Sequence, residues 1–375
     1  MPLVEGSPSL RDSLPARIAR VLRLDLPLLA GLLAIAAFGL AVVYSAGGEN
    51  GALLWRQTLR VAIALAALVV AAQFPPHTLR QWTPWVFAAG LALLIVVEIA
   101  GDIGKGAQRW LDLGFMRFQP SELMKLAVPM MVAWYLHARP LPPTLGEVIV
   151  SVLIIVVPAV LIARQPDLGT AILVGSAGAL ALFLAGLRWR LILTALAACS
   201  AAAWYLWPRL HEYQRQRILT FLDPQRDPLG SGYHTIQSTI AIGSGGVFGK
   251  GWLNGTQSQL EFLPERHTDF IFAVIGEEFG LIGALLLLAL YAFVIGRGFV
   301  IALRAERTYD RIVAGSIALT FFIYVFVNIG MVAGLLPVVG VPLPLVSYGG
   351  TSMVTLFVGF GMLMSIHSQR KFMSP

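Results

Sequence analysis

Charged residues and cysteine are scarce in this chain. Only 13% of its 375 residues are Asp, Glu, Lys or Arg, and 57% are hydrophobic, whereas soluble globular proteins are about 25% charged and about 45–50% apolar. This balance excludes an ordinary soluble enzyme. The single cysteine, Cys199, lies inside an apolar block, which excludes an intramolecular disulfide and a cysteine-based metal site.

Basic runs and metal-binding motifs are also missing. The net charge is +7, but the Arg and Lys residues stand singly in short loops between apolar blocks, a pattern that does not suit nucleic-acid binding. The six histidines show no HExxH or similar spacing, so the sequence predicts no metal site.

A glycine-rich run from Gly243 to Gly251 resembles a phosphate loop at first sight. It departs from the Walker pattern, because Ser244 stands where the first Gly should be and Gly251 where Ser or Thr should be. Glycine-rich backbone near Lys250 could still hold a diphosphate. A plain flexible turn explains the run equally well.

Long hydrophobic blocks are abundant. Blocks close to the roughly 20 residues that a helix needs to cross a bilayer recur from Leu26 to Ile366. They predict an all-α, polytopic integral membrane protein with ten transmembrane helices. The predicted spans are 26–46, 53–74, 82–100, 121–138, 147–163, 168–187, 190–208, 269–296, 312–336 and 349–367.

The distribution of basic residues predicts the orientation. With the N-terminus inside, Arg and Lys are about twice as frequent in the inside segments as in the short outside loops, as the positive-inside rule requires. Both termini are then cytoplasmic, because ten is an even number. We expect cytoplasmic tails at 1–25 and 368–375 and a membrane domain at 26–367. One long extracytoplasmic loop, 208–268, joins the seventh and eighth helices, and its apolar centre indicates a segment folded onto the bundle.

Polar groups gather at the predicted outer ends of the spans, which favours a site for a substrate with both a lipid and a polar part. Glu122 and Lys125 are three residues apart at the start of a span, so they share a helix face. Ionisable groups inside a span mark function or a paired partner. The pair therefore has a role in the site. Alternatively, the two charges only neutralise each other and orient the span.

Two further clusters lie at this predicted outer rim. Arg109 and Trp110 could grip a phosphate and stack on a ring, or they could be a solvated Arg beside an interfacial aromatic anchor. Glu265, His267 and Asp269 crowd the point where apolar sequence resumes. A carboxylate beside such an apolar wall can act as a general base, and a first-turn carboxylate that only complements the helix dipole is the alternative.

The ordered motifs of the chain are similar to those of the SEDS family of shape, elongation, division and sporulation proteins. They are GAQRWL from Gly106, QPSE from Gln119 with Lys125, RQPDLGT from Arg164, GTQSQLEFLPERHTDFIF from Gly255 and NIGMVAGLLPVVGVPLPLVSYGGTS from Asn328. The resemblance extends from about Asp25 to Gln369. Within the family, Gly255–Gln259 and the short N-terminal tail are more like the rod-shape branch than the division branch.

The resemblance implies a peptidoglycan glycosyltransferase of cell elongation and rod-shape maintenance. Such an enzyme polymerises lipid II into glycan strands at the outer face of the bacterial cytoplasmic (inner) membrane and releases undecaprenyl diphosphate. Its implied partner is a class B penicillin-binding protein, a transpeptidase, of the elongation machinery. No cofactor is certain, and a divalent cation such as Mg²⁺ could sit at the lipid diphosphate.

The resemblance also assigns roles to residues. The essential acidic residue of the family falls on Asp269, which we expect to be the catalytic base, and Trp110, Glu122 and Lys125 match further motif positions. The candidate substrate-binding residues are Arg56, Arg109, Trp110, Glu122, Lys125, Arg215, Arg217, Lys250, Glu265 and His267.

Two other functions fit a polytopic bundle with charged groups in its spans. A lipid II flippase would show paired broken helices in two repeated halves, whereas here the only interrupted apolar stretch lies near the C-terminus. A scaffold that merely recruits the transpeptidase would leave the carboxylate at the membrane rim without a task.

Overall fold

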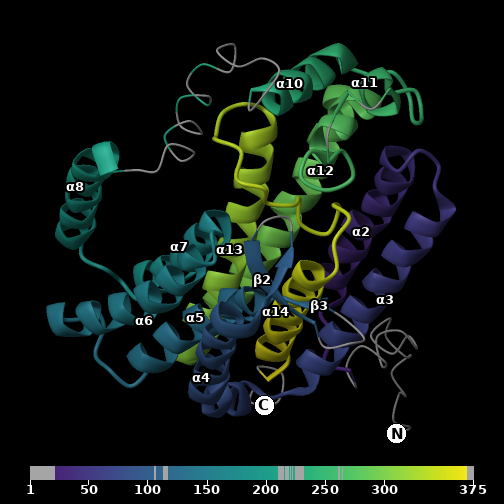
Figure 1. The fold of residues 1–375 in the computed structure, drawn as a ribbon. Coiled ribbons are helices and arrows are strands. Elements are labelled where there is room, and N and C mark those ends of the chain that lie inside the picture. Colours follow the sequence, from purple (N-terminus) through teal and green to yellow (C-terminus); the bar gives the residue numbers. More distant parts are fainter. Residues whose placement is uncertain are drawn as a thin grey trace, which may run out of the picture.

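The computed structural model describes residues 22–104, 107–112, 117–209, 215, 219, 221, 223, 232–260, 262–263 and 265–369. Helices lie at all ten positions where the sequence predicts membrane spans (Figure 1). They are α2 (Leu26–Ala46), α3 (Gly51–Gln73), α4 (Pro76–Ala100), α5 (Pro120–Leu136), α6 (Leu145–Arg164), α7 (Leu168–Leu184), α8 (Trp189–Leu206), α12 (Ile271–Arg304), α13 (Thr308–Val332) and α14 (Thr351–Gln369). Between α8 and α12 the described chain adds η2 (Trp207–Arg209), α10 (Tyr233–Gly245) and α11 (Thr256–Gln259).

Seven of these helices are long and apolar enough to cross a membrane: α2, α3, α4, α6, α12, α13 and α14. The chain is therefore a polytopic membrane protein. Helices α5 and α7 have 17 residues each, about 25 Å of helix, which is shorter than the roughly 30 Å hydrocarbon core. The apolar part of α8, Trp189–Ala198, is shorter still. Ten spans and the cytoplasmic position of both termini stay predictions.

The fold is all-helical, as predicted, apart from one small antiparallel sheet. Strands β1 (Asp102–Gly104), β2 (Ala107–Asp112) and β3 (Arg117–Phe118) pair in the order β1-β2-β3 between α4 and α5. Trp110 lies opposite Asp102, and Leu111 lies opposite Phe118. Strands of two to six residues are too short to produce a clear alternating pattern in the sequence. The sheet places Arg109 beside the turn between α6 and α7.

Side-chain caps fix where several helices begin. The Asp25 carboxylate accepts a hydrogen bond from the amide of Leu28 at 2.9 Å, and Asn50 accepts from the first amides of α3. Asp167 accepts from the amide of Thr170 at 3.1 Å and so begins α7. Each cap satisfies a backbone donor that has no partner inside the helix.

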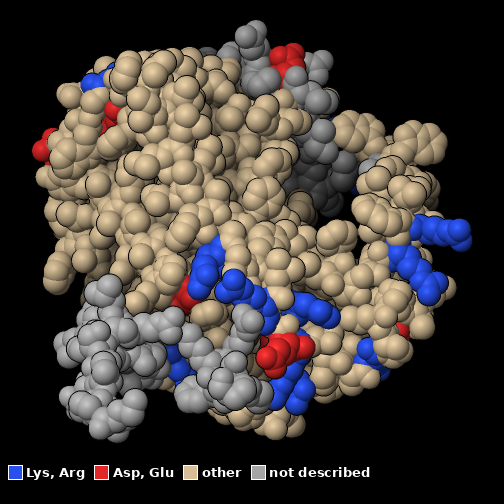
Figure 2. Space-filling model, turned by 180° about the vertical axis from the view of Figure 1, so that it is seen from behind, with Lys and Arg blue, Asp and Glu red and all other residues tan. Residues whose placement is uncertain are grey.

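Helix α13 is the centre of the bundle. Among the seven candidate spans it is the most buried, since 67% of its apolar stretch is buried. It packs against α5, α7, α12 and α14. The face seen in Figure 2 is mostly uncharged, and most of its visible charged side chains gather in the lower half. An uncharged surface of this extent suits contact with lipid.

Helix α12 is broken at Gly280, whose backbone adopts φ 62° and ψ −159°. The loop after α10 fills the break with four backbone hydrogen bonds. The amides of Lys250 and Gly251 donate to the carbonyls of Glu277 and Glu278, each at 3.0 Å. In the other direction, the amides of Leu281 and Ile282 donate to the carbonyls of Gly246 and Val247, at 3.0 and 3.2 Å. The glycine-rich run therefore pairs with the broken helix.

Glycine is required where these two backbones meet. A Cβ atom at Gly249, which has φ +79°, would stand 2.1 Å from the carbonyl oxygen of Glu278. A Cβ atom at Gly280 would stand 2.4 Å from the amide nitrogen of Gly249. These contacts explain the glycines by backbone packing, without a bound phosphate.

The proline-rich segment between α13 and α14 folds back into the bundle. Val346 and Ser347 are buried, and a Cβ atom at Gly39 of α2 would stand 2.7 Å from the Cα of Val346. Tyr291 donates a hydrogen bond to the carbonyl of Pro344 at 2.6 Å. Irregular backbone at this depth is thus satisfied by protein.

Candidate active site

The segment that carries Asp269 is anchored through its backbone. The Ser347 hydroxyl donates to the carbonyl of Thr268 at 2.6 Å, and the amide of Tyr348 donates to the carbonyl of His267 at 2.8 Å. The amide of Asn328 donates to the carbonyl of Asp269 at 2.9 Å. Asp269 thereby lies half-buried at the start of α12, held by both α13 and the proline-rich segment.

The proline-rich segment also runs beside the Asp269 carboxylate. Gly340 has φ +74°, and a Cβ atom there would stand 3.4 Å from Oδ2 of Asp269. The same Asn328 amide that holds Asp269 donates to the carbonyl of Val341 at 2.7 Å. One buried side chain of α13 therefore sets the spacing between the carboxylate and this backbone.

Helix α3 contributes a cation through Arg60. Its guanidinium carbon lies 4.2 Å from the ring centroid of Tyr348, and the Tyr348 ring meets His267 edge-on at 5.8 Å. Gln57 donates to the carbonyl of Ser347 at 3.1 Å. The sequence analysis names Arg56, which is exposed. Arg60 lies one helical turn later on the same face, a spacing that could have identified it.

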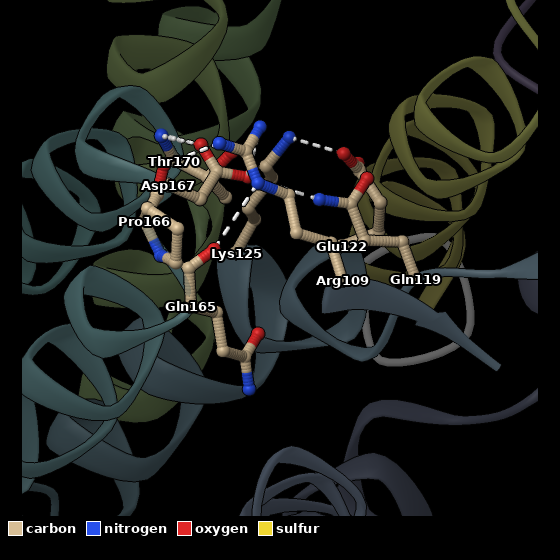
Figure 3. A network of polar contacts seen from close by, with 8 residues as sticks. All are labelled: Arg109, Gln119, Glu122, Lys125, Gln165, Pro166, Asp167 and Thr170. Carbon is tan, nitrogen blue, oxygen red and sulfur yellow. Dashed lines mark hydrogen bonds and ion pairs between the residues drawn. The ribbon is translucent and has the colours of Figure 1, made fainter. Parts of the chain in front are cut away.

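A second polar cluster joins β2, α5 and α7 (Figure 3). The Arg109 guanidinium lies 3.7 Å from Oδ2 of Asp167 and donates to the carbonyls of Gln165, at 3.2 Å, and Pro166. Gln119 donates to the same carboxylate oxygen at 3.1 Å. Arg109 is about one-third exposed, so it can still meet a ligand from its open side.

The predicted pair of Glu122 and Lys125 is present and buried. Nζ of Lys125 lies 2.6 Å from Oε1 of Glu122, and the two side chains are 9% and 7% exposed. Nζ also lies 5.0 Å from the ring centroid of Tyr324. The pair and Thr320 line a cavity of about 20 Å³, room for about one water molecule. In the described part of the chain, the second carboxylate oxygen of Glu122 and the hydroxyl of Thr320 lack a hydrogen bond.

The pair of Glu122 and Lys125 and the Asp269 segment lie along one face of α13. Tyr324, beside Lys125, and Asn328, which holds Asp269, are four residues apart on this helix. That spacing is about one turn, or roughly 6 Å along the axis. The polar groups of α5 and the Asp269 segment are thus neighbours, although far apart in the sequence.

Other predicted site residues lie elsewhere or have partners. Lys250 contacts Glu277 at 2.7 Å and donates to the Thr256 hydroxyl, also at 2.7 Å. Arg215 lies 5.7 Å from the ring centroid of Trp207. Arg217 lies outside the described residues.

Glu265 lies on the Asp269 segment, and Trp110 lies beside Arg109. Glu265 is exposed on the Asp269 segment, with φ 50°, and its carboxylate accepts a hydrogen bond from Thr268 at 2.9 Å. Trp110 is half-buried in β2, next to Arg109.

The sequence analysis did not identify His234. Its ring stacks on Phe270, next to Asp269, with centroids 5.7 Å apart. Burial lowers the pKa of the His234 imidazole, while the charge of Glu265 acts in the opposite direction. No motif marks a histidine in a long loop, so only the folded chain shows its place beside the site.

Known proteins similar in sequence cover nearly the whole chain. The family model for cell cycle proteins of the FtsW, RodA and SpoVE type matches residues 20–372. Peptidoglycan glycosyltransferase MrdB of Escherichia coli is 54% identical over 352 residues, which are 94% of this chain and 95% of that protein. A probable peptidoglycan glycosyltransferase FtsW of Geobacter metallireducens is 36% identical over 362 residues, 93% of this chain and 96% of that protein.

Solved structures share the fold. The rod shape determining protein RodA of Thermus thermophilus superimposes with a TM-score of 0.71 at 30% identity, covering 94% of this chain and 98% of that one. A chain from a peptidoglycan synthase complex that coordinates polymerization and crosslinking gives a TM-score of 0.82 at 35% identity. It covers 93% of this chain and 99% of its own length.

Proposed function

The chain belongs to the FtsW/RodA/SpoVE family of cell cycle proteins and is a peptidoglycan glycosyltransferase, and we propose that it polymerises lipid II at the outer face of the cytoplasmic membrane. The similarity to RodA supports a role in elongation and rod shape. The observation that carries the proposed chemistry is the anchoring of Asp269, since three hydrogen bonds hold its segment at the start of α12.

Asp269 is the general base of the proposed reaction. The donor is the growing glycan on undecaprenyl diphosphate, and the acceptor is lipid II. The 4-hydroxyl oxygen of the acceptor GlcNAc attacks C1 of the donor MurNAc, and Asp269 takes the hydroxyl proton. The bond from C1 to the diphosphate oxygen breaks with inversion, and undecaprenyl diphosphate leaves with the electron pair. A positioned base of this kind contributes about 10²- to 10⁴-fold in rate.

We propose that three cations support the departure of the diphosphate. Arg60 is held on the Tyr348 ring next to the Asp269 segment, and Arg109 is fixed by Asp167. Lys125 forms an ion pair with Glu122, so a diphosphate would compete with this carboxylate for the ammonium group. Glu122 positions Lys125 and performs no chemistry itself. Fixed cations stabilise a leaving anion without reorganising during the reaction.

A divalent cation such as Mg²⁺ would be bound mainly through the substrate. In the described part of the chain no three His, Cys, Asp or Glu residues come together to hold a metal. Mg²⁺ is usually held by one or two carboxylates together with substrate phosphates. Glu265 and Asp269 are the carboxylates of the site segment that could complete such coordination, and the ion would supply further neutralisation of the diphosphate.

A class B penicillin-binding protein is the proposed partner. The structural similarity to a chain of a peptidoglycan synthase complex supports an assembly in which polymerisation and crosslinking are coordinated. The partner would be the transpeptidase of the elongation machinery, and both proteins would lie in the cytoplasmic membrane.

A lipid II assay separates this function from its rivals. Purified protein, alone and with the transpeptidase, is incubated with labelled lipid II, and products are resolved on a glycan gel. Polymer is the expected result. If well-folded protein forms no polymer but carries lipid II across liposome bilayers, the protein is a flippase. If neither occurs, it is a scaffold.

A further inference from the structure

Helices α5, α13 and α14 together enclose the cavity beside Glu122 and Lys125. The cavity measures about 20 Å³, and a buried water molecule needs at least about 10–15 Å³ on the same measure. This space suits a single water molecule rather than a lipid chain or a sugar ring. What the cavity binds then depends on the polar atoms of its wall.

Three hydrogen-bonding atoms of this wall have no partner within the described residues. They are Oε2 of Glu122 and the hydroxyl oxygens of Thr320 and Tyr324. Each of these three residues is more than nine-tenths buried. A buried polar atom without a partner is unfavourable, most of all when it carries charge. Water molecules inside proteins typically make about three hydrogen bonds to atoms of this kind.

Two other polar groups of the wall are already paired. Nζ of Lys125 lies 2.6 Å from Oε1 of Glu122 (Figure 3), and the hydroxyl of Thr355 donates to the carbonyl of Thr351 at 3.1 Å. The Lys125 ammonium group supplies the positive charge that the carboxylate needs, so a metal cation does not suit this space. A neutral ligand that both donates and accepts hydrogen bonds fits the two hydroxyl donors and the carboxylate acceptor that remain.

We propose that this cavity binds one ordered water molecule that holds the Glu122 carboxylate in place. The hydroxyls of Thr320 and Tyr324 donate to the water oxygen, and the water donates to Oε2 of Glu122. Both carboxylate oxygens are then fixed, Oε1 by Lys125 and Oε2 through α13. Thr320 is a positioning residue, because it acts on Lys125 only through the water and Glu122. This last step rests on the proposed function of Lys125 at the diphosphate, whereas the water site does not.

A high-resolution structure of the full-length protein tests the water site without an assay of activity. We expect one water molecule about 2.5–3.0 Å from Oε2 of Glu122 and from the hydroxyls of Thr320 and Tyr324. Thr320→Val keeps the shape of the side chain, removes its donor and should lose or displace this water. The control Thr355→Val removes an already paired hydroxyl from the same wall and should keep it. No water in the wild type, or an unchanged water in Thr320→Val, overturns the proposal.

Turnover in lipid II polymerisation tests the positioning role. Thr320→Val should lower kcat about tenfold, the effect of losing roughly one hydrogen bond, with a smaller change in KM, because the diphosphate needs Lys125 most as it leaves. Thr320→Ser keeps the hydroxyl and should restore most of the rate, and Thr355→Val should match the wild type. A wild-type rate in Thr320→Val, or no rescue by serine, overturns this role. Wild-type protein that makes no polymer would contradict the proposed function instead, and the structures would still decide the water site.

Discussion

The buried amide of Asn328 donates to the backbone carbonyl of Asp269 at 2.9 Å and to that of Val341 at 2.7 Å. This side chain joins the central helix α13 to both segments that border the carboxylate. The catalytic geometry therefore depends on a residue that need not touch the substrate.

Replacing Asn328 by Leu should lower the turnover number for lipid II polymerisation more than it raises KM. The variant leaves two carbonyls without their donor, at a cost of about 1–3 kcal/mol for each buried polar group, and it frees the Asp269 segment to shift. Steady-state kinetics checks this. The control Ser365→Ala removes a comparable hydrogen bond, to the carbonyl of Phe74 in a different part of the bundle, and should keep normal turnover. Equal kinetics in both variants would show that Asn328 does not position the site.

The buried pair of Glu122 and Lys125 permits a test that separates stability from function. Lys125→Met leaves a buried carboxylate without its partner and should cost about 3–5 kcal/mol. The double variant Glu122→Leu with Lys125→Met should regain most of that stability in thermal unfolding, because apolar residues can replace a buried ion pair. Polymerisation should stay lost in both. Activity in the stable double variant would mean that the pair only orients α5.

The contact between the glycine-rich loop and α12 predicts a severe effect at Gly249. Gly249→Ala would place a Cβ atom 2.1 Å from a backbone oxygen and should lower the unfolding free energy by about 3 kcal/mol or more. Gly243, in the same run, has open space around it. Gly243→Ala should therefore stabilise α10 by about 0.5–1 kcal/mol. Similar unfolding temperatures for the two variants would refute the interlocked backbones.

Acidic pH should lower the free energy of unfolding, because Asp25 becomes protonated. Its carboxylate accepts two hydrogen bonds from Arg297, at 3.0 and 2.6 Å, and lies 3.2 Å from His367. Burial opposes the charged form, but these partners and the Leu28 amide prevail, so the pKa of Asp25 lies below its usual value of 3.8. The stabilisation is therefore present above that value and is lost as the pH falls through the lowered pKa.

The stability difference between wild type and Asp25→Asn should accordingly be full at pH 5 and shrink as the pH falls below about 4. Thermal unfolding across this range measures it. A difference that grows toward acid pH would reverse the sign and contradict the proposed ion pairs.

Features carried by local sequence could be predicted. The apolar blocks mark every long helix, and the three-residue spacing of Glu122 and Lys125 predicts their contact. The break at Gly280 could not be predicted, because its neighbours are apolar on both sides and the pairing loop lies some 30 residues earlier in the chain.

Contacts between residues far apart in the sequence could not be predicted either. Arg109, on strand β2, gains its partner Asp167 from the start of α7. The spacing from Arg56 points to Arg60, but its contact with Tyr348 is set by the fold. The role of Asp269 comes from family resemblance together with its place at the start of α12, and it stays a prediction.

The central claim is that Asp269 takes the acceptor proton, and the polymerisation rate of Asp269→Asn with labelled lipid II tests it most directly. The variant keeps the size of the side chain and should unfold near the wild-type temperature, while its rate should fall about 10²- to 10⁴-fold. Glu306→Gln, which changes an exposed carboxylate between α12 and α13, should polymerise normally. A folded Asp269→Asn protein that polymerises lipid II at the wild-type rate would contradict the account.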